Sequence, residues 1–407
     1  MKTLNKIKSF FEKKMNENKT LEYIINKIKI NSLTNTEIKQ IIDIILKTKN
    51  KTTEDIKLLI YKFNNTKIDK LPLSMYMLDN NINKKYNLST GQIMSILEIS
   101  DITYKNYIGF MLPTYILRNN KYGKFNLSSN QIMPLLEKSD LLSQDCNKSS
   151  LPMYLLKHNK EQNLNLSPKQ IISILEKSDL TAQNQFGRTL PMFLLNNNKE
   201  QELNLSPNQI MSVIEKSDLY IQDRSGWTLP MYILKYNKSE ELNLSPEQIM
   251  SVIEKTNLSI QDHDNMTLPM HILSNNKKQN LNLSPKQIMS IIEKTNISNQ
   301  DIQGRTLPVY LLKYNKEQNL NLSPKQIMSI LERPNLPLLD DRFITMFFNE
   351  LTNTPIDKQL YKTVTLFNTK IKEISPENQD KINKILFHYE IEENIQKKHK
   401  SKNTNKL

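Results

Sequence analysis

Few residues of this 407-residue chain have the type and spacing that catalysis requires. A nucleophile needs a base within hydrogen-bond reach, and the single cysteine, Cys146, has no identifiable base. The histidines show no recurrent acid or nucleophile beside them; they are His158, His263, His271, His388 and His399. The 6 glycines form no phosphate-binding loop, and no cysteine-rich or histidine-rich metal spacing occurs. The sequence therefore predicts a protein that is not an enzyme and uses no cofactor or metal.

Side chains suited to binding recur at fixed places instead. One series, here called the ring ladder, comprises Tyr76, Tyr115, Tyr154, Phe193, Tyr232, His271 and Tyr310. A second series of differing side chains comprises Phe110, Ser149, Arg188, Trp227, Met266 and Arg305. Trp227, the only tryptophan, has Arg224 close by, and this pairing of residue types is enriched in binding hot spots. The residues predicted to contact a partner are Tyr115, Tyr154, Phe193, Tyr232, His271, Tyr310, Arg188, Arg224, Trp227 and Arg305.

Each series also has a structural alternative. Large rings flanked by apolar residues contribute strongly to cores, and solvent positions without constraint vary freely. His271 distinguishes the two alternatives for the ring ladder, because a lone imidazole suits a wet groove better than an apolar interior.

The region that carries both series repeats with a period of 39 residues. Seven glutamines mark it within phrases like SPKQIMSILEK: Gln92, Gln131, Gln170, Gln209, Gln248, Gln287 and Gln326. A fixed period of this length is typical of a stacked array in which each unit packs on its neighbours. The sequence therefore predicts a solenoid with one extended core.

The first helix of each repeat is predicted from phrases like LPMYLLKHN. Pro152 falls in the opening turn, where its missing N–H costs no intrahelical bond, and the apolar residues 151–156 indicate burial. An asparagine ends the phrase in every copy: Asn81, Asn120, Asn159, Asn198, Asn237, Asn276 and Asn315. Asparagine tolerates the left-handed conformation that closes helices, so a helix stop is expected there. A ladder of functional amides is the alternative.

The second helix begins at a capping box. In Ser167-Pro168-Lys169-Gln170 the serine and the glutamine can each satisfy a backbone N–H of the first turn. Ile171, Ile174 and Leu175 then fall at i, i+3 and i+4, which predicts an apolar stripe that packs against neighbouring repeats. A methionine follows in six copies, and we expect it to join this packing.

The connection between repeats resembles the junction of ankyrin repeats, in which the pattern D-x-x-G-x-T forms a projecting turn. The acid position is occupied by Asn106, Asp145, Asn184, Asp223, Asp262, Asp301 and Asp340. The glycine position is occupied by Gly109, Lys148, Gly187, Gly226, Asn265, Gly304 and Phe343. Glycine suits a turn with positive φ and asparagine is next best, so Lys148 and Phe343 mark imperfect units. The threonine position is occupied by Met111, Ser150, Thr189, Thr228, Thr267, Thr306 and Thr345.

The resemblance spans about residues 71–351, with two departures. This chain shows T-L-P-M where ankyrin repeats show T-P-L-H, and its period is 39 instead of 33. It implies an all-α solenoid of ankyrin-like helix-turn-helix repeats with projecting turns and helical end caps; another helix-pair solenoid is the alternative. The expected domains are a helical cap over 1–70, the array over 71–351, a second helical cap over 352–395, and a disordered basic tail over 396–407.

The charge distribution bears on the class of partner. The net charge is +14, but the array contributes a surplus of only 2, against 8 in residues 1–70 and 4 in residues 352–407. A continuous basic face along the array is therefore not indicated, and nucleic acid is not the expected partner. The alternative is an adaptor for nucleic acid or an anionic membrane that acts through the basic terminal segments.

By analogy with the family it resembles, the chain is expected to be a monomeric scaffold that binds a protein partner through the concave face and the turn tips. Ankyrin-like proteins of intracellular microbes add a finer possibility, an effector directed at host proteins. One cysteine fits a reducing compartment, and neither a secretory signal nor a run of 18 apolar residues is present. A cytoplasmic location is expected, with export by a non-classical route left open.

Overall fold

The computed structural model describes residues 20–333 except 29–32, 64–65, 70, 84–85, 107–108 and 332. It also describes residues 9, 10 and 13 and, toward the C-terminus, 361–362, 364–365, 368, 376, 379–380, 382–384, 386–387 and 389–391. The chain divides into two compact units, Met1–Leu205 and Ser206–Leu407. Over the described ranges, no helix combines the length and the apolar character that a membrane span requires.

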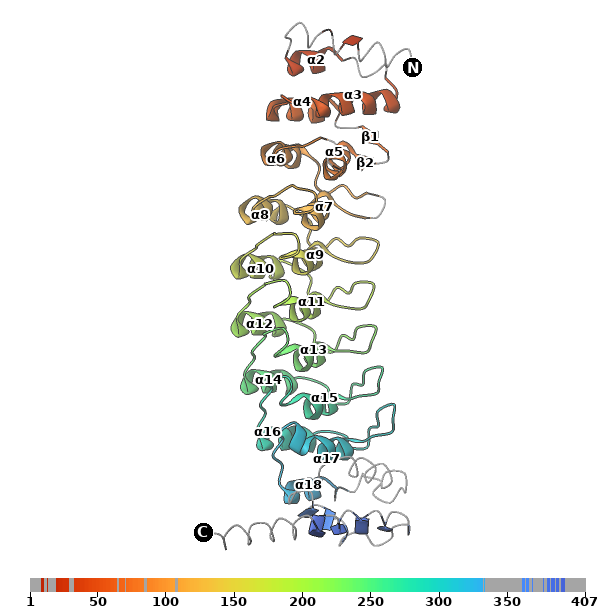
Figure 1. Cartoon of the computed structure of the whole chain (residues 1–407), viewed down its shortest axis with the longest axis vertical. Coiled ribbons are helices and arrows are strands. Elements are labelled where there is room, and N and C mark those ends of the chain that lie inside the picture. Colours follow the sequence, from red (N-terminus) through yellow and green to blue (C-terminus); the bar gives the residue numbers. More distant parts are fainter. Residues whose placement is uncertain are drawn as a thin grey trace, which may run out of the picture. The chain divides into compact units, whose positions relative to one another are not determined.

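Unit 1 contains two rows of helices and one short hairpin. Its helices are α2 (Leu21–Lys27), α3 (Asn35–Lys47), α4 (Thr53–Phe63), α5 (Leu73–Ile82), α6 (Thr90–Ile99), α7 (Leu112–Asn119), α8 (Ser129–Glu137), α9 (Leu151–His158), α10 (Pro168–Leu175) and α11 (Leu190–Asn197). Strands β1 (Lys67–Ile68) and β2 (Leu71–Pro72) pair antiparallel, with Ile68 opposite Leu71. The first helices α5, α7, α9 and α11 stack in sequence, and the second helices form the other row (Figure 1).

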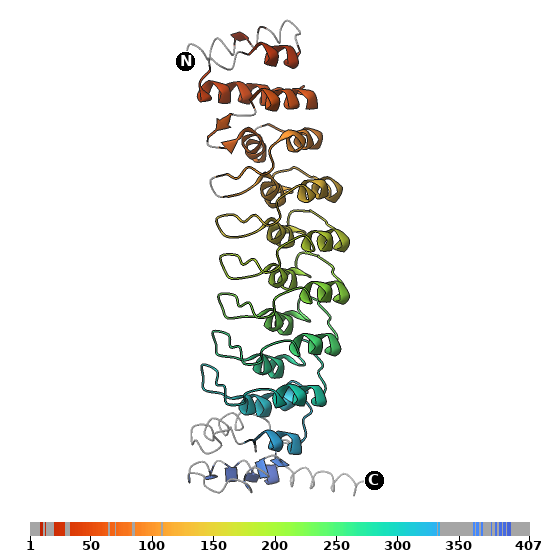
Figure 2. The same ribbon diagram turned by 180° about the vertical axis from the view of Figure 1, so that it is seen from behind.

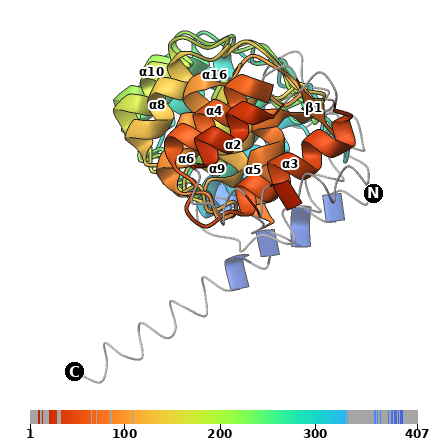
Figure 3. The ribbon, with the colours of Figure 1, turned by 90° about the horizontal axis from the view of Figure 1, so that it is seen from above.

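The N-terminal helices continue the second row of unit 1. Helix α2 packs on α4 and α4 packs on α6, as the view onto this end shows (Figure 3). Helices α2, α3 and α4 lie within residues 1–70, and the role of this segment as a cap stays a prediction. The boundary at residue 70 stays a prediction.

Unit 2 repeats the same alternation. Its helices are α12 (Pro207–Ile214), α13 (Leu229–Tyr236), α14 (Pro246–Ile253), α15 (Leu268–Asn275), α16 (Pro285–Glu293), α17 (Leu307–Glu317) and α18 (Pro324–Leu331). The first helices α13, α15 and α17 stack on one another, and a turn projects before each of them (Figure 2). The predicted solenoid of helix pairs is therefore confirmed. The predicted tail over 396–407 and the junction residues Asp340, Phe343 and Thr345 lie outside the described residues.

Both helix signals read from the sequence are confirmed. Pro152 lies in the first turn of α9, and the side chains of residues 151–156 are all buried. At the start of α10 the Gln170 side chain accepts the Ser167 N–H at 2.9 Å, while the Ser167 hydroxyl accepts the Gln170 N–H at 3.4 Å. The same box recurs at Ser206, Ser245 and Ser284. Each second helix thus begins at a position that two reciprocal bonds define.

The expected left-handed asparagine at the end of the first helix is wrong. Asn237 has φ −51° and ψ −44°, which is right-handed helical backbone, and its side chain is 1% exposed. Its Oδ1 accepts the N–H of Leu244 at 2.8 Å, and its Nδ2 donates to the carbonyl of Gln279 in the next repeat at 3.3 Å. The asparagines therefore form a buried structural amide ladder, because each satisfies backbone groups that its connection leaves inside the protein.

The left-handed residues lie in the connection that follows. Asn163 and Asn165 have φ of 53° and 49°, and they alternate with Leu164 and Leu166, which are 0% and 3% exposed. Asparagine adopts this backbone at low cost, so the alternation turns both leucines inward. The added residues of the 39-residue period thus contribute to the core.

We predict that Asn237→Ala lowers the free energy of unfolding by about 2–3 kcal/mol, because it leaves buried backbone N–H and C=O groups unsatisfied. Lys238→Ala, which truncates an adjacent exposed side chain, serves as the control. Urea denaturation of both variants measures the difference. Equal stability of the two variants would contradict a structural role for the amide ladder.

We further predict that unit 2 tolerates loss of a whole period but not of half a period. Deleting residues 229–267 joins Thr228 to Leu268 and keeps each repeat in contact with an equivalent neighbour, so helicity per residue is retained. Deleting residues 229–248 removes the first helix and breaks the register. Far-UV circular dichroism and thermal melting compare the two proteins. Similar melting curves would rule out coupling between repeats.

Candidate partner-binding surface

The projecting turns are short hairpins that the junction acid holds in place. In the turn after α8, the N–H of Asp145 donates to the carbonyl of Ser149 at 3.1 Å. Asp145 Oδ1 accepts the N–H groups of Asn147 and Ser149 at 2.8 and 2.9 Å, while its Oδ2 accepts the hydroxyl of Tyr154 at 2.5 Å. One carboxylate therefore joins the turn to the first helix of its own repeat.

The same bond links the acid to the ring nine residues later in three further repeats. The distances are 2.7 Å for Asp223–Tyr232, 2.8 Å for Asp262–His271 and 2.8 Å for Asp301–Tyr310. Two repeats carry asparagine at the acid position. Phe193 follows Asn184 and has no hydroxyl to donate, whereas Tyr115, which follows Asn106, donates to Asp79 at 2.8 Å instead. Each polar ring of the ladder from Tyr115 onward thus has a carboxylate partner, and the ring that lacks one is Phe193.

The ring ladder is largely buried. Tyr154, Tyr232, His271 and Tyr310 are 9%, 3%, 5% and 2% exposed, and Tyr115 and Phe193 are half-buried. These values favour the packing alternative for the ladder over direct contact with a partner. The expectation that His271 needs a wet groove is wrong, because Asp262 gives the imidazole a hydrogen-bond partner inside the protein.

Burial also keeps the ring hydroxyls protonated. Desolvation, together with the hydrogen bond to Asp145, raises the pKa of Tyr154 to about 12. Burial pushes the pKa of Asp262 upward, but the bonds from His271 and from two backbone N–H groups outweigh it and leave that pKa below its usual value. The Tyr154 hydroxyl is therefore a donor, and the Asp262 carboxylate an acceptor, at neutral pH.

The glycine position of the junction requires positive φ. Gly226 has φ 77°, and a Cβ added there would lie 2.8 Å from the Cα of Asp262 in the next repeat. Lys148 and Asn265 hold the same backbone with φ of 55° and 57°. The turn geometry thus survives at imperfect units, at a conformational cost in the Lys148 unit.

Neighbouring turns are tied together by glutamines that the sequence interpretation missed. Gln222 Nε2 donates to the carbonyl of Gly226 at 2.7 Å and to the carbonyl of Gln261, one repeat on, at 2.9 Å. Gln144 bridges its own turn and Gln183 in the same way, at 2.7 and 3.2 Å. The available signal was a glutamine immediately before the junction residue in five consecutive repeats: Gln144, Gln183, Gln222, Gln261 and Gln300. Backbone hydrogen bonds also connect neighbouring turns; for example, the His263 N–H donates to the Ser225 carbonyl at 3.0 Å.

The structure brings Trp227 together with two members of the ring ladder. Its ring centroid lies 4.8 Å from that of His271 and 6.0 Å from that of Tyr232, and Lys235 Nζ lies 4.5 Å above the indole. Trp227 is half-buried, whereas Arg224, three residues earlier, is exposed. This turn thus combines a supported aromatic surface with an exposed cation.

The other predicted arginines differ in their surroundings. Arg305 is partly committed to its own repeat, because it pairs with Asp301 at 2.7 Å and lies over the ring of Tyr310. Arg188 is half-buried at the tip of the Asn184 turn. Of the predicted arginines, Arg224 has the most exposed side chain.

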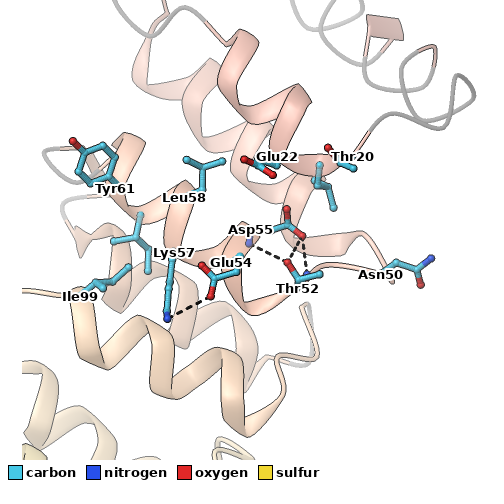
Figure 4. A pocket seen from close by; sticks show the side chains of 12 residues that line it. Thr20, Glu22, Asn50, Thr52, Glu54, Asp55, Lys57, Leu58, Tyr61 and Ile99 are labelled. Atoms are coloured by element: carbon cyan, nitrogen blue, oxygen red, sulfur yellow. Dashed lines mark hydrogen bonds and ion pairs between the residues drawn. The ribbon is translucent and has the colours of Figure 1, made fainter.

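One pocket on the described residues lies apart from all predicted site residues. It has a volume of about 840 Å³ and lies at the N-terminal end of unit 1, against α2 and α4 (Figure 4). Leu58 and the exposed Tyr61 line it together with polar groups. Asp55 there accepts the N–H and hydroxyl of Thr52 at 2.8 Å, so these two residues close the first turn of α4. Part of the polar lining is therefore already engaged in helix capping.

No arrangement for metal binding is found among the described residues, which contain no group of three or more His, Cys, Asp and Glu suited to an ion. His158 bonds Glu161 at 2.8 Å, and His263 and Cys146 are exposed. His388 and His399 lie outside the described residues.

The acid–ring bond can be tested by a double-mutant cycle in unit 1. We predict that Tyr154→Phe and Asp145→Asn each cost about 1–2 kcal/mol of unfolding free energy, because each removes the bond between them. The double variant recreates the Asn184–Phe193 combination, so its loss falls short of the sum by about 1 kcal/mol. Urea denaturation gives the four values, and Tyr122→Phe, at an exposed ring, is the control. Strictly additive losses would refute the coupling.

Comparison with known proteins gives similarities among solved structures alone. No family model and no curated protein matches the sequence. Among solved structures, the chain is similar to the ankyrin repeat domain of Bcl-3, a member of the IkappaB protein family, at 11% identity over 63% of this chain and 97% of that one, with a TM-score of 0.37. An ankyrin repeat domain from Acinetobacter baumannii AYE matches at 16% identity over 53% and 98%, with a TM-score of 0.36.

A third similarity is to the crystal structure of a predatory endopeptidase from Bdellovibrio bacteriovorus in complex with an immunity protein. It has 14% identity over 56% of this chain and 99% of that chain, with a TM-score of 0.34. The repeat unit itself carries the assignment, since two helices joined to a projecting hairpin turn form the ankyrin motif. On that unit, the chain has an ankyrin-like fold with a 39-residue period.

Proposed function

We propose that the chain is a non-enzymatic scaffold that binds a protein partner through its turn tips and the adjoining first helices. The observation that carries this proposal is a turn backbone that is the same in each described repeat, with a tip side chain that differs. Each described turn is a hairpin closed by its junction residue, while the position before the threonine changes from Phe110 to Trp227 to Arg305. A backbone ordered before binding avoids much of the entropy cost of recognition.

The ring ladder takes a supporting role in this proposal. Its members hold the turns through the junction acids, and Trp227 rests on His271. A partner would then contact the outer layer formed by Arg224, Trp227 and Lys235, and not the buried rings. We further propose a monomer that acts in the cytoplasm, with a host-directed effector as the finer alternative. The single exposed cysteine agrees with a reducing compartment.

The second candidate function uses the ends of the chain. Residues 1–70 and 352–407 carry surpluses of 8 and 4 positive charges, which suits nucleic acid or an anionic membrane. Only composition supports this alternative, since much of both segments lies outside the described residues. Binding that falls steeply with salt, and that persists after deletion of the array, would favour it.

We predict that the double variant Arg224→Ala/Trp227→Ala weakens capture of a protein partner from a lysate by about 2 kcal/mol, because it removes an exposed cation and a supported aromatic surface. Lys255→Ala, at an exposed lysine that follows α14, is the matched control and retains capture. Quantitative pull-down with the intact chain measures both.

Stability distinguishes binding from packing in that experiment. Because Trp227 is half-buried against His271, we expect a fall in melting temperature that is small beside the loss of capture. Unchanged capture by the double variant, or an equal loss in the lysine control, would overturn the proposed role of this turn.

A further inference from the structure

In unit 1, positive charges predominate on the turns and first helices and negative charges on the second helices, although the charges of the whole array nearly cancel. Its turn and first-helix segments, residues 103–119, 142–158 and 181–197, hold five cations and one acid, Asp145. The cations, here called the basic face, are Lys105, Arg118, Lys148, Lys157 and Arg188. The second-helix segments, residues 89–102, 128–141 and 167–180, hold six acids and three lysines. Figure 1 shows the turns of unit 1 on the side away from the second helices.

The one acid in these segments, Asp145, forms hydrogen bonds within its own repeat. Asp145 accepts two turn N–H groups and the Tyr154 hydroxyl, so its oxygens are already engaged. Unit 2 differs, because its corresponding segments, residues 220–236, 259–275 and 298–314, hold four cations and four acids. The net charge over these segments is thus positive in unit 1 and zero in unit 2, where Asp223, Asp262 and Asp301 bond their turns and rings as Asp145 does.

Arg118 lies at the centre of this face in a position set by aromatic rings. Its guanidinium carbon is 4.6 Å from the ring centroid of Phe110 and 5.7 Å from that of Tyr154 in the next repeat. The arginine is exposed, and within the described part of the chain no carboxylate forms an ion pair with it. A guanidinium over a ring keeps its in-plane N–H groups available for a bidentate bond to a carboxylate.

Lys157 extends the same arrangement into the next repeat. It occupies the position of Arg118 one period later, at the end of α9, and it is exposed. Lys148 is exposed on the neighbouring turn tip. The three cations come from two consecutive repeats, whose turns are joined by a bond from Lys105 Nζ to the Gln144 carbonyl at 3.4 Å, so their spacing is set by the frame.

We propose that the basic face of unit 1 binds an acidic protein segment, with Arg118 as the central anchor and Lys148 and Lys157 beside it. This inference rests on the proposed scaffold function and specifies the chemistry of the partner. Carboxylates on an extended segment match exposed cations held one repeat apart, and complementary charge of this kind contributes to both specificity and association rate.

Single-stranded nucleic acid fits the anchor of this face less well, because the rings beside Arg118 are already covered. Arg118 lies over Phe110, whose ring also meets Tyr154 edge-on at 5.8 Å. Tyr154 stacks on His158 with an interplanar angle of 9°. Nonspecific recognition of single strands relies on open ring faces on which bases stack, and these rings offer none.

The test uses the full chain and three fluorescently labelled probes: a 12-residue peptide rich in Asp and Glu, its Asn/Gln counterpart, and a 12-nucleotide single strand. Fluorescence anisotropy should show that the acidic peptide binds best. Arg118→Glu should weaken its binding about tenfold or more, and Arg118→Met, which keeps an aliphatic stem on Phe110, should weaken it less. Lys177→Glu, on the second-helix side of unit 1, should change it by less than about twofold, because exposed charges at a distance are screened.

Two results would overturn the inference. One is an equal loss in the Lys177→Glu and Arg118→Glu variants at unchanged melting temperature, since that outcome indicates general attraction to a basic chain. The other is tighter binding of the oligonucleotide than of the acidic peptide. A separate outcome tests the scaffold function. If the Arg118→Glu variant still captures a protein that the Arg224→Ala/Trp227→Ala variant no longer captures, the proposal of an acidic partner is contradicted and the proposal of a scaffold is not.

Discussion

The described turns depend on the two oxygens of the junction acid. Asp145 Oδ1 closes the turn by accepting two backbone N–H groups, and Oδ2 holds the ring of the following helix. The Oδ1 bonds fix the conformation of the turn, and the Oδ2 bond fixes its orientation relative to the first helix. Together they set the position of the tip. Hydrogen bonds from glutamines such as Gln222, and backbone bonds such as that from His263 to Ser225, connect each turn to the turn of the next repeat.

Asparagine at the acid position of the junction shows the same dependence on the side-chain oxygen that closes the turn. An asparagine at the acid position retains the carbonyl oxygen that closes the turn, and Asn184 still accepts the N–H groups of Phe186 and Arg188 at 2.9 and 3.0 Å. Its amide nitrogen is a donor and cannot accept a hydroxyl. The ring that follows is Phe193, which needs no acceptor. The chain thus contains, between its own repeats, the same pair of substitutions that a double-mutant cycle would introduce.

Local signals explain which parts of the fold could be predicted from the sequence. The capping box at Ser167 and the proline at Pro152 act within one helical turn, so their meaning did not depend on distant residues. The role of Asn237 could not be found this way, because its partners lie 7 and 42 residues along the chain. His271 was misjudged for the same reason, since its partner Asp262 lies in the preceding turn. The charge sum over the whole array likewise concealed the basic face of unit 1, because folding separates segments that composition averages.

The separation of frame and tip gives the array a physical means of changing its partner without changing its fold. The buried residues fix where each tip lies, so substitution of an exposed tip side chain alters the chemistry offered and leaves most of the folding energy untouched. The two units illustrate two outcomes of that freedom. Around Arg118 the tips present cations beside buried rings, whereas around Trp227 they present a half-buried indole with the cations Arg224 and Lys235 beside it. Equivalent frames can therefore support chemically different contacts, which makes the identity of the tips, more than the repeat itself, the determinant of specificity.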